Sequence, residues 1–529
     1  MKGYFSLLLH AHLPFVRHPE YNDFLEEDWL YEALTESYLP LVHVFDGLIK
    51  DNISFNLTMT LSPSLCAMLE DDLLMSRYSK YLSKMLELSE KELVRTKTLP
   101  LQNETAKMYN DKLSLYQGIF ENQYKRGILA AFKKFQDRGY LEIITCAATH
   151  AFLPFIKYEK AIDAQIKIAK QEYQRVFKRE ASGIWLPECA YKEGLDEILK
   201  NNGIKYFFTE THGVSSADPQ PKNNVYAPII CPKSEVIVFA RDVETSEQVW
   251  SKENGYPGDF RYREFYRDLG YDADYEYIKP YLHSDGVSRN IGFKYHRITG
   301  RCDLSEKEYY SPQEAVTLAA CHADNFIEYR KKQVEHLAGT LGQKPLVLAN
   351  YDAELFGHWW FEGPVFLDFL FRKIYAEQDV FELVTLSKYL EFEKNTKFEI
   401  AQPADSSWGA YGYYDIWLNK TNDWIYKHLH KCEEIMIDIA KNYNDSAGLT
   451  KRALNQAARE LLLAQASDWA FIMKTGTMVE YAHKRTKDHI LRFLKLYESI
   501  ESDCIDEETL SDYEKKDNIF PNLSYQLYS

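Results

Sequence analysis

The chain has 529 residues, of which 45% are hydrophobic and 15% aromatic, so it is long enough for a large core and for more than one domain. Its net charge of −16 argues against nucleic acid and against an anionic membrane surface as partners, because both need clustered Lys and Arg. The eight cysteines are scattered without a C-x-x-C pair, which indicates reduced thiols and predicts a cytoplasmic location.

Short apolar runs recur along most of the chain and are separated by helical stretches. The first run meets histidines at once and lacks a cleavage site, so we interpret it as a strand and not as a signal peptide. Near-continuous apolarity predicts strands buried on both faces, as in a parallel sheet. Seven or eight strand–helix units fit a closed or nearly closed α/β barrel better than an open sheet, which is the alternative. The seven runs are residues 4–9, 53–59, 141–146, 183–187, 204–208, 345–350 and 381–386.

Three regions depart from this alternation. Residues 75–138 place Leu, Lys, Glu and Tyr at helical spacing, and we expect a helical insertion there. Residues 210–344 are irregular, with a hairpin pattern and an aromatic, glycine-bearing loop, and so long an excursion usually covers a site. Residues 406–529 have no strand pattern and are predicted to form a helical C-terminal domain, which leaves 1–405 as the barrel domain.

Two carboxylates directly follow predicted strands. Glu188 comes after GIWLP, and Asp352 follows the run that ends in PLVLAN. The carboxyl ends of the strands hold the active site in parallel barrels, so we expect both acids at one rim. Glycoside hydrolysis needs such a pair, since one carboxylate attacks the anomeric carbon or activates water while the other protonates the leaving oxygen. The alternative is that each is a solvated or ion-paired acid at a strand end.

His10 and His12 form an H-x-H pattern at the end of the first run. Residues two apart on a strand point the same way, so both rings can enter one site. Together with His150 and Asp352 they would also suit a metal-dependent hydrolase. Histidines that simply pack and hold no metal are the commoner case, and spacing alone leaves both interpretations open.

Tryptophans cluster near the second carboxylate and at the start of the C-terminal region. Trp359 and Trp360 follow Asp352 shortly, and Trp408 and Trp417 lie in a glycine-bearing segment beside short polar residues. Such rings either fill the core or stack on sugar faces while polar neighbours meet the hydroxyls.

Five segments spread over nearly the whole chain match known motif regions in order. They are HAHLPF (10–15), ATHAFLP (148–154), GIWLPECAY (183–191), YDAELFGHWWFEG (351–363) and ASDWAFIM (466–473). With these segments the chain resembles glycoside hydrolase family 57. Within that family it is most similar to the 1,4-α-glucan branching enzymes and their close relatives described as α-amylases.

The resemblance implies an incomplete (β/α)7 barrel with a helical insertion and an all-helical C-terminal domain that contributes to the site. It also implies a retaining mechanism without metal or organic cofactor, with Glu188 as nucleophile and Asp352 as general acid and base. The substrate would be an α-1,4-glucan that serves as donor and acceptor in glycogen-type metabolism. The residues implied to bind it are His10, His12, His150, Arg267, Gly286, Trp360, Trp408, Trp417 and Asp468.

The acceptor decides the activity within this family. Transfer to a glucan 6-hydroxyl makes a branch, whereas transfer to water makes an amylase. Branching members carry a mobile loop with a tyrosine over the site, and Tyr226 and Tyr256 lie in the right excursion without an obvious match. On the strength of the resemblance we predict a branching enzyme, with an α-amylase-type hydrolase as the alternative. A metal-dependent hydrolase using His10 and His12 and a catalytically silent glucan-binding protein are remote alternatives.

Overall fold

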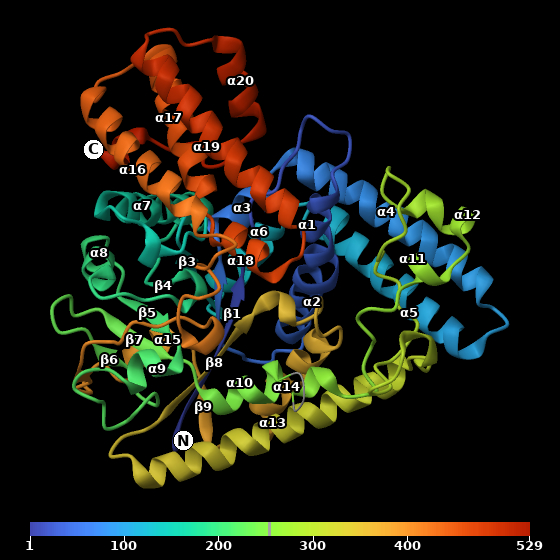
Figure 1. The fold of residues 1–529 in the computed structure, drawn as a ribbon. Coiled ribbons are helices and arrows are strands. Elements are labelled where there is room, and N and C mark those ends of the chain that lie inside the picture. Colours follow the sequence, from blue (N-terminus) through green and yellow to red (C-terminus); the bar gives the residue numbers. More distant parts are fainter. Residues whose placement is uncertain (252–254) are drawn as a thin grey trace.

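A computed structural model describes residues 1–251 and 255–529, and its centre is one ten-stranded sheet. The strand order is β10-β6-β7-β5-β4-β3-β2-β1-β8, and β9 pairs with β1 as well. Figure 1 shows this sheet surrounded by helices, with the C-terminal helices α16, α17, α19 and α20 gathered at the top of the view. The strands are β1 (Gly3–Ala11), β2 (Leu57–Leu61), β3 (Leu141–Cys146), β4 (Gly183–Trp185), β5 (Tyr206–Thr209), β6 (Ile229–Ile230), β7 (Ile237–Ala240), β8 (Leu346–Asp352), β9 (Phe381–Leu383) and β10 (Glu399–Ile400).

Most of the described residues outside the sheet are helical. None of these helices is long and apolar enough to cross a membrane. Their bounds are α1 (Asp28–Ala33), α2 (Leu39–Lys50), α3 (Pro63–Leu69), α4 (Asp72–Arg95), α5 (Pro100–Gln117), α6 (Ile128–Asp137), α7 (Glu159–Phe177), α8 (Leu195–Asn201), α9 (Thr211–Ser215), α10 (Val243–Trp250), α11 (Leu269–Asp272), α12 (Tyr275–Ile278), α13 (Pro312–Thr340), α14 (Gly363–Glu377), α15 (Leu386–Phe392), α16 (Trp424–Asn442), α17 (Gly448–Ala464), α18 (Ser467–Thr475), α19 (Val479–Glu501) and α20 (Glu507–Lys516).

The sheet forms a barrel that does not close completely. Strands β5, β4, β3, β2, β1 and β8 pair in parallel in that order, and β7 joins β5 in parallel on the other side. A backbone hydrogen bond of 3.0 Å from Asp242 N to Leu348 O links the end of β7 to β8. The predicted fold class, an incomplete α/β barrel followed by a helical C-terminal region, is confirmed.

Strand β1 pairs with three other strands of the sheet. All nine of its residues are buried, as expected for a strand covered on both faces. Its C-terminal half pairs with β2 and its N-terminal half with β9, while β8 runs along its opposite edge. Phe5 packs edge-on against Phe326 of α13, with ring centroids 5.8 Å apart, so the long helix covers the barrel at this strand.

Two strand predictions were inaccurate. Residues 53–56 do not belong to β2, because the backbone of Ile53 donates to Leu48 O at 2.9 Å and Asn52 is left-handed, which ties this stretch to the end of α2. The predicted hairpin exists as β6 and β7, but its second strand pairs with β5 and is therefore a strand of the barrel.

The region 210–344 is less irregular than expected, since it contains α13 with 29 residues. Ser311 caps this helix by accepting from Glu314 N, and Pro312 occupies its first position. These start signals and the regular spacing of buried Ala315, Leu318 and Ala319 were present in the sequence.

Gly183→Ala tests the packing that fixes β4. A Cβ atom there would lie 2.1 Å from the ring of Tyr206. This ring is buried, and its hydroxyl donates a hydrogen bond to the carboxylate of Glu142. We expect a loss of about 1–3 kcal/mol in the free energy of unfolding, measured by urea denaturation. Gly118→Ala is the control, because nothing lies within 4 Å and the residue is helical, so it should be neutral or stabilising by up to about 1 kcal/mol. Equal midpoints for the two variants would contradict this packing.

Candidate active site

Strand pairing brings the predicted rim residues together. His10 lies directly opposite Asp352 in the β1–β8 pairing, and Cys146 lies opposite Trp185 where β3 meets β4. His150 and Glu188 follow these two strands at the same end of the barrel. One cavity of about 660 Å³ is lined by seven of the predicted site residues, namely His10, His12, His150, Glu188, Asp352, Trp408 and Asp468.

The backbone turns sharply at Glu188. Its φ of 62° and the φ of 50° at Cys189 are left-handed values that side chains other than glycine rarely adopt. Such strain persists only where the surroundings hold it, and it concentrates at functional sites. Here the backbone N–H of Trp408 donates to Glu188 O at 3.0 Å and fixes the turn.

The Glu188 carboxylate is held by two residues from the C-terminal part of the chain. Trp408 Nε1 donates to Oε2 at 2.7 Å, and Ser467 Oγ donates to Oε1 at 3.0 Å. Burial raises the pKa of Glu188 to about 7, and the hydrogen bond from Trp408 acts in the opposite direction because it stabilises the charged form.

Asp352 has a different environment. Its carboxylate has no hydrogen-bond partner among the described residues, and burial raises its pKa well above the ordinary value, helped by the nearby charges of Glu354 and Glu188. When one of two neighbouring carboxyl groups receives hydrogen bonds and the other does not, their pKa values move apart, so that the first ionises while the second keeps its proton. The arrangement therefore favours an ionised Glu188 and a protonated Asp352.

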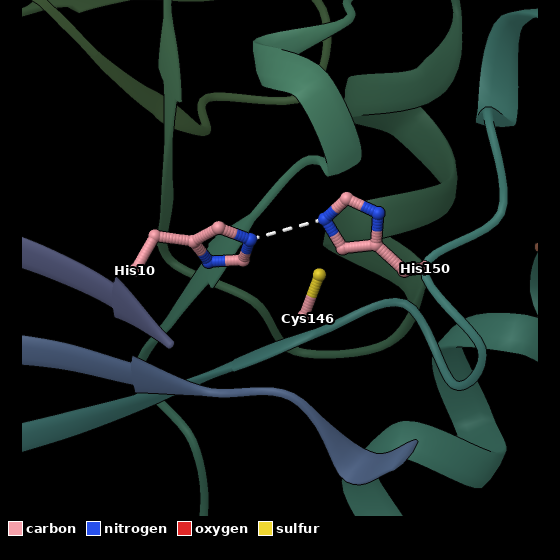
Figure 2. A group of neighbouring side chains, drawn as sticks. All are labelled: His10, Cys146 and His150. Carbon is pink, nitrogen blue, oxygen red and sulfur yellow. Dashed lines mark hydrogen bonds between the residues drawn. The ribbon is translucent and has the colours of Figure 1, made fainter. Parts of the chain in front are cut away.

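Buried histidines form the floor beside Glu188. His10 Nε2 and His150 Nε2 are 3.0 Å apart and share a hydrogen bond (Figure 2), and His150 Nδ1 lies 2.8 Å from Ser467 Oγ. Burial lowers the pKa of both rings well below the ordinary value, so both are neutral near pH 7. Their ring nitrogens are bonded within the protein or buried, so the two rings position Ser467 beside Glu188 without adding charge.

His12 completes the cluster from the same strand. Its Nδ1 lies 2.8 Å from Ser62 Oγ, and its Nε2 lies 3.1 Å from an oxygen of Asp468, the second residue of α18. The ring stacks on His150 with centroids 3.7 Å apart. The expectation that both histidines of the H-x-H pattern enter one site is confirmed.

Of the three groups of described side chains that bring possible metal ligands within 4.8 Å of one another, two lie at this site: His10, Cys146 and His150, drawn in Figure 2, and His12, His150 and Asp468. Both groups use His150, whose two ring nitrogens already have protein partners. Burial raises the pKa of Cys146 well above the ordinary value, so it stays a thiol and a poor ligand. A metal would have to replace these hydrogen bonds, so the donor set suits a hydrogen-bonded cluster better.

Several cavity residues were not anticipated. Arg241 follows β7, which was not recognised as a barrel strand, and it pairs with Glu210 at 2.7 Å. Glu354 accepts from His12 N at 3.2 Å and from the hydroxyl of Tyr38. Nothing in the sequence around α1 singled out its contribution to the cavity. The unanticipated aromatic residues are Trp29, Trp250 and Phe471, whereas Trp359 was one of the tryptophans that the sequence analysis considered for sugar stacking.

Two predicted tryptophans lie in the core and do not line the cavity. Trp360 is 1% exposed and packs on Phe366 with centroids 4.9 Å apart, while its neighbour Trp359 faces the cavity. Trp417 is also 1% exposed and stacks on Phe152 at 4.6 Å. Core filling, the simpler of the two interpretations, describes both residues.

The residues of region 210–344 that were considered for substrate binding do not line the cavity either. Arg267 pairs with Asp272 at 2.8 Å and donates to a backbone carbonyl, so its guanidinium is engaged within the excursion itself. The carbonyl of Gly286 accepts from a neighbouring tyrosine hydroxyl at 2.8 Å. Tyr226 supports the opposite end of β8 through its backbone, and Tyr256 bonds to α13, so neither lies over the cavity.

Comparison with known proteins gives consistent matches over the whole chain. The profile of glycosyl hydrolase family 57 matches residues 6–403, and a profile described as the C-terminal part of 1,4-alpha-glucan branching enzymes matches residues 428–528. A 1,4-alpha-glucan branching enzyme from Thermococcus kodakarensis is 33% identical over 561 residues, which covers 98% of this chain and 78% of the relative.

Solved structures agree with these matches. The alpha-amylase AmyC from Thermotoga maritima is 47% identical with a TM-score of 0.93, covering 100% of this chain and 99% of that one. A GH57-type branching enzyme from Pyrococcus horikoshii is 34% identical with a TM-score of 0.88, covering 100% of this chain and 97% of that one.

Glu188→Gln tests the electrostatic cost of the buried carboxylate. The folded pKa of about 7 exceeds the ordinary 4.5, so the native state binds this proton more tightly, and wild-type stability falls as pH rises from about 4.5 to about 7. Glutamine does not titrate and keeps the shape. We expect the variant to gain stability relative to wild type across this window, by up to about 3 kcal/mol above pH 7.

The measurement is thermal unfolding of both proteins between pH 4 and pH 8. Glu193→Gln, which removes an exposed carboxylate nearby, is the control for loss of one charge. A stability difference between wild type and Glu188→Gln that does not change with pH would contradict the buried-carboxylate account.

Proposed function

Since the chain belongs to glycosyl hydrolase family 57, we propose that it is a 1,4-α-glucan branching enzyme. It cleaves an α-1,4 bond, holds the freed chain covalently, and transfers that chain to a 6-hydroxyl of an α-glucan. One observation carries this proposal. Glu188 and Asp352 line the same cavity, and of the two only Glu188 has side-chain donors for its carboxylate among the described residues.

The two carboxylates divide the chemistry between them. Glu188 attacks the anomeric carbon and forms a glycosyl–enzyme bond, while Asp352 gives its proton to the glycosidic oxygen of the leaving chain. Asp352, now a carboxylate, then takes the proton from the acceptor hydroxyl as that oxygen attacks the anomeric carbon and releases Glu188. Two inversions give overall retention.

The surrounding residues bind and orient the sugar. His10 and His150 are neutral, line the cavity and position Ser467 beside Glu188, and Asp468 holds His12 in place. The edge of the Trp408 ring meets Glu188 through Nε1, and the ring lines the cavity where its face suits the sugar whose anomeric carbon reacts.

Branching requires that a glucan hydroxyl reach the intermediate before water does. The aromatic side chains that line the cavity favour a sugar chain over water, because flat rings stack on sugar faces and exclude solvent. The match of residues 428–528 to the C-terminal part of branching enzymes supports this choice. The 47% identity to a protein described as an α-amylase supports hydrolysis as the second candidate.

Incubation with amylose distinguishes these activities. We expect new α-1,6 linkages, followed by proton NMR, to outnumber new reducing ends. Glu188→Ala should lower both rates by roughly 10³-fold or more, the scale of losing a catalytic nucleophile. Glu193→Ala, an exposed glutamate on the same segment, should behave as wild type.

Other outcomes of this assay have definite meanings. Reducing ends with few linkages would identify a hydrolase. Loss of activity on chelation, restored by a metal, would favour the metal-dependent alternative. Activity unchanged in Glu188→Ala would contradict the mechanism.

A further inference from the structure

A second cavity of about 360 Å³ adjoins the catalytic one. Its walls come from the segment after α1, from α2, α4 and α5, from residues 290–294 and from the start of α14. The two cavities share Glu32 and His358 as lining residues. The volume falls within the range of roughly 300–1,000 Å³ that is usual for small-molecule sites.

A hydrogen bond, an ion pair and a pair of stacked rings lie between the two cavities and form the partition. His358 Nδ1 bonds to Glu36 Oε2 at 2.9 Å, and Glu36 also pairs with Arg263 at 3.1 Å. Across this partition Phe265, which lines the second cavity, stacks on Trp359, which lines the catalytic one, with centroids 4.6 Å apart and planes 13° apart. An aromatic surface therefore continues from one cavity into the other.

The lining of the second cavity suits a neutral, hydroxyl-rich ligand. Glu32, Lys112 and the hydroxyls of Tyr81 and Tyr116 line it and have no hydrogen-bond or ion-pair partner among the described residues. Lys112 Nζ lies 3.9 Å from the centroid of the Phe361 ring. Burial raises the pKa of Glu32 to about 7 and lowers the pKa of Lys112 to about 8, so the lining carries little net charge. Aromatic faces together with a few polar groups that have no partner are the combination that binds a sugar.

The position of the second cavity indicates which sugar chain it would hold. In the proposed mechanism Asp352 protonates the leaving chain and later deprotonates the acceptor, so the acceptor binds on the Asp352 side. His358 and Trp359 follow Asp352 on the same segment, and His358 lines both cavities while Trp359 lines the catalytic one. The second cavity therefore adjoins the catalytic one at the segment that carries Asp352.

We propose that the second cavity is an acceptor site, which binds a segment of the α-1,4-glucan that receives the transferred chain. This inference rests on the proposed function, because it takes Asp352 as the acid and base. Holding the acceptor beside the glycosyl–enzyme bond raises its effective concentration and so favours transfer over hydrolysis.

The direct test is a crystal structure of Glu188→Gln with maltotriose. We expect sugar density in the second cavity against Lys112 and Tyr116, in addition to density in the catalytic cavity. Val365→Trp, made in the same background, fills the second cavity from a half-buried lining position and should remove only the second set of density. A second cavity that stays empty at saturating maltotriose, while the catalytic cavity is occupied, would overturn the proposal.

A kinetic test uses wild-type Glu188. Lys112→Met and Val365→Trp should lower the ratio of transfer to hydrolysis on amylose by about 5- to 10-fold, the scale of one lost hydrogen bond. Release of fluoride from maltosyl fluoride, which needs no acceptor, should stay within about twofold and shows that the variants are folded. Lys107→Met, an exposed lysine on the same helix, is the matched control and should keep the wild-type ratio.

The two tests separate failure of this proposal from failure of the proposed function. If the protein hydrolyses glucan and makes no branches, the crystal structure still decides whether sugar occupies the second cavity. Wild-type transfer ratios in both Lys112→Met and Val365→Trp would overturn the acceptor role.

Discussion

The site depends on the hydrogen bonds that Trp408 and Ser467 give to the carboxylate of Glu188. Glu188 lies in the turn that follows barrel strand β4, whereas its two partners lie more than 200 residues further along the chain. A buried carboxylate at a strained backbone position would stay protonated without donors, because burial penalises the charge. Docking of the C-terminal region on the barrel therefore does more than cover the site, since it supplies the donors that let Glu188 ionise.

Burial also keeps three neighbours of Glu188 uncharged, namely His10, His150 and Asp352. His10 and His150 are buried and neutral, so they add no charge beside Glu188; they bond to each other, and His150 also bonds to Ser467. Asp352 has none of these donors, and its neighbours Glu354 and Glu188 favour the protonated form. One cavity thus holds an ionised carboxylate and a protonated carboxyl group, the combination that the proposed retaining transfer needs at the same moment.

Much of this could be predicted from local sequence. Continuous apolar runs located most of the barrel strands, and the residues after them located Glu188 and Asp352, because parallel strands end at one rim. Arg241 was missed because its short strand looked like half of a hairpin and its parallel partner β5 is remote in sequence. The choice between Trp359 and Trp360 depends on how one turn after β8 is packed, and neither composition nor spacing determines that orientation.

Trapping the covalent intermediate tests the central claim most directly. A 5-fluoro-α-glycosyl fluoride forms the glycosyl–enzyme bond faster than the bond is broken, so the sugar stays on the nucleophile. Peptide mass spectrometry should then find the label on Glu188 of the segment 183–191, and Trp408→Phe should slow the labelling because Glu188 loses a donor. A label on Asp352 or on any other residue would contradict the account.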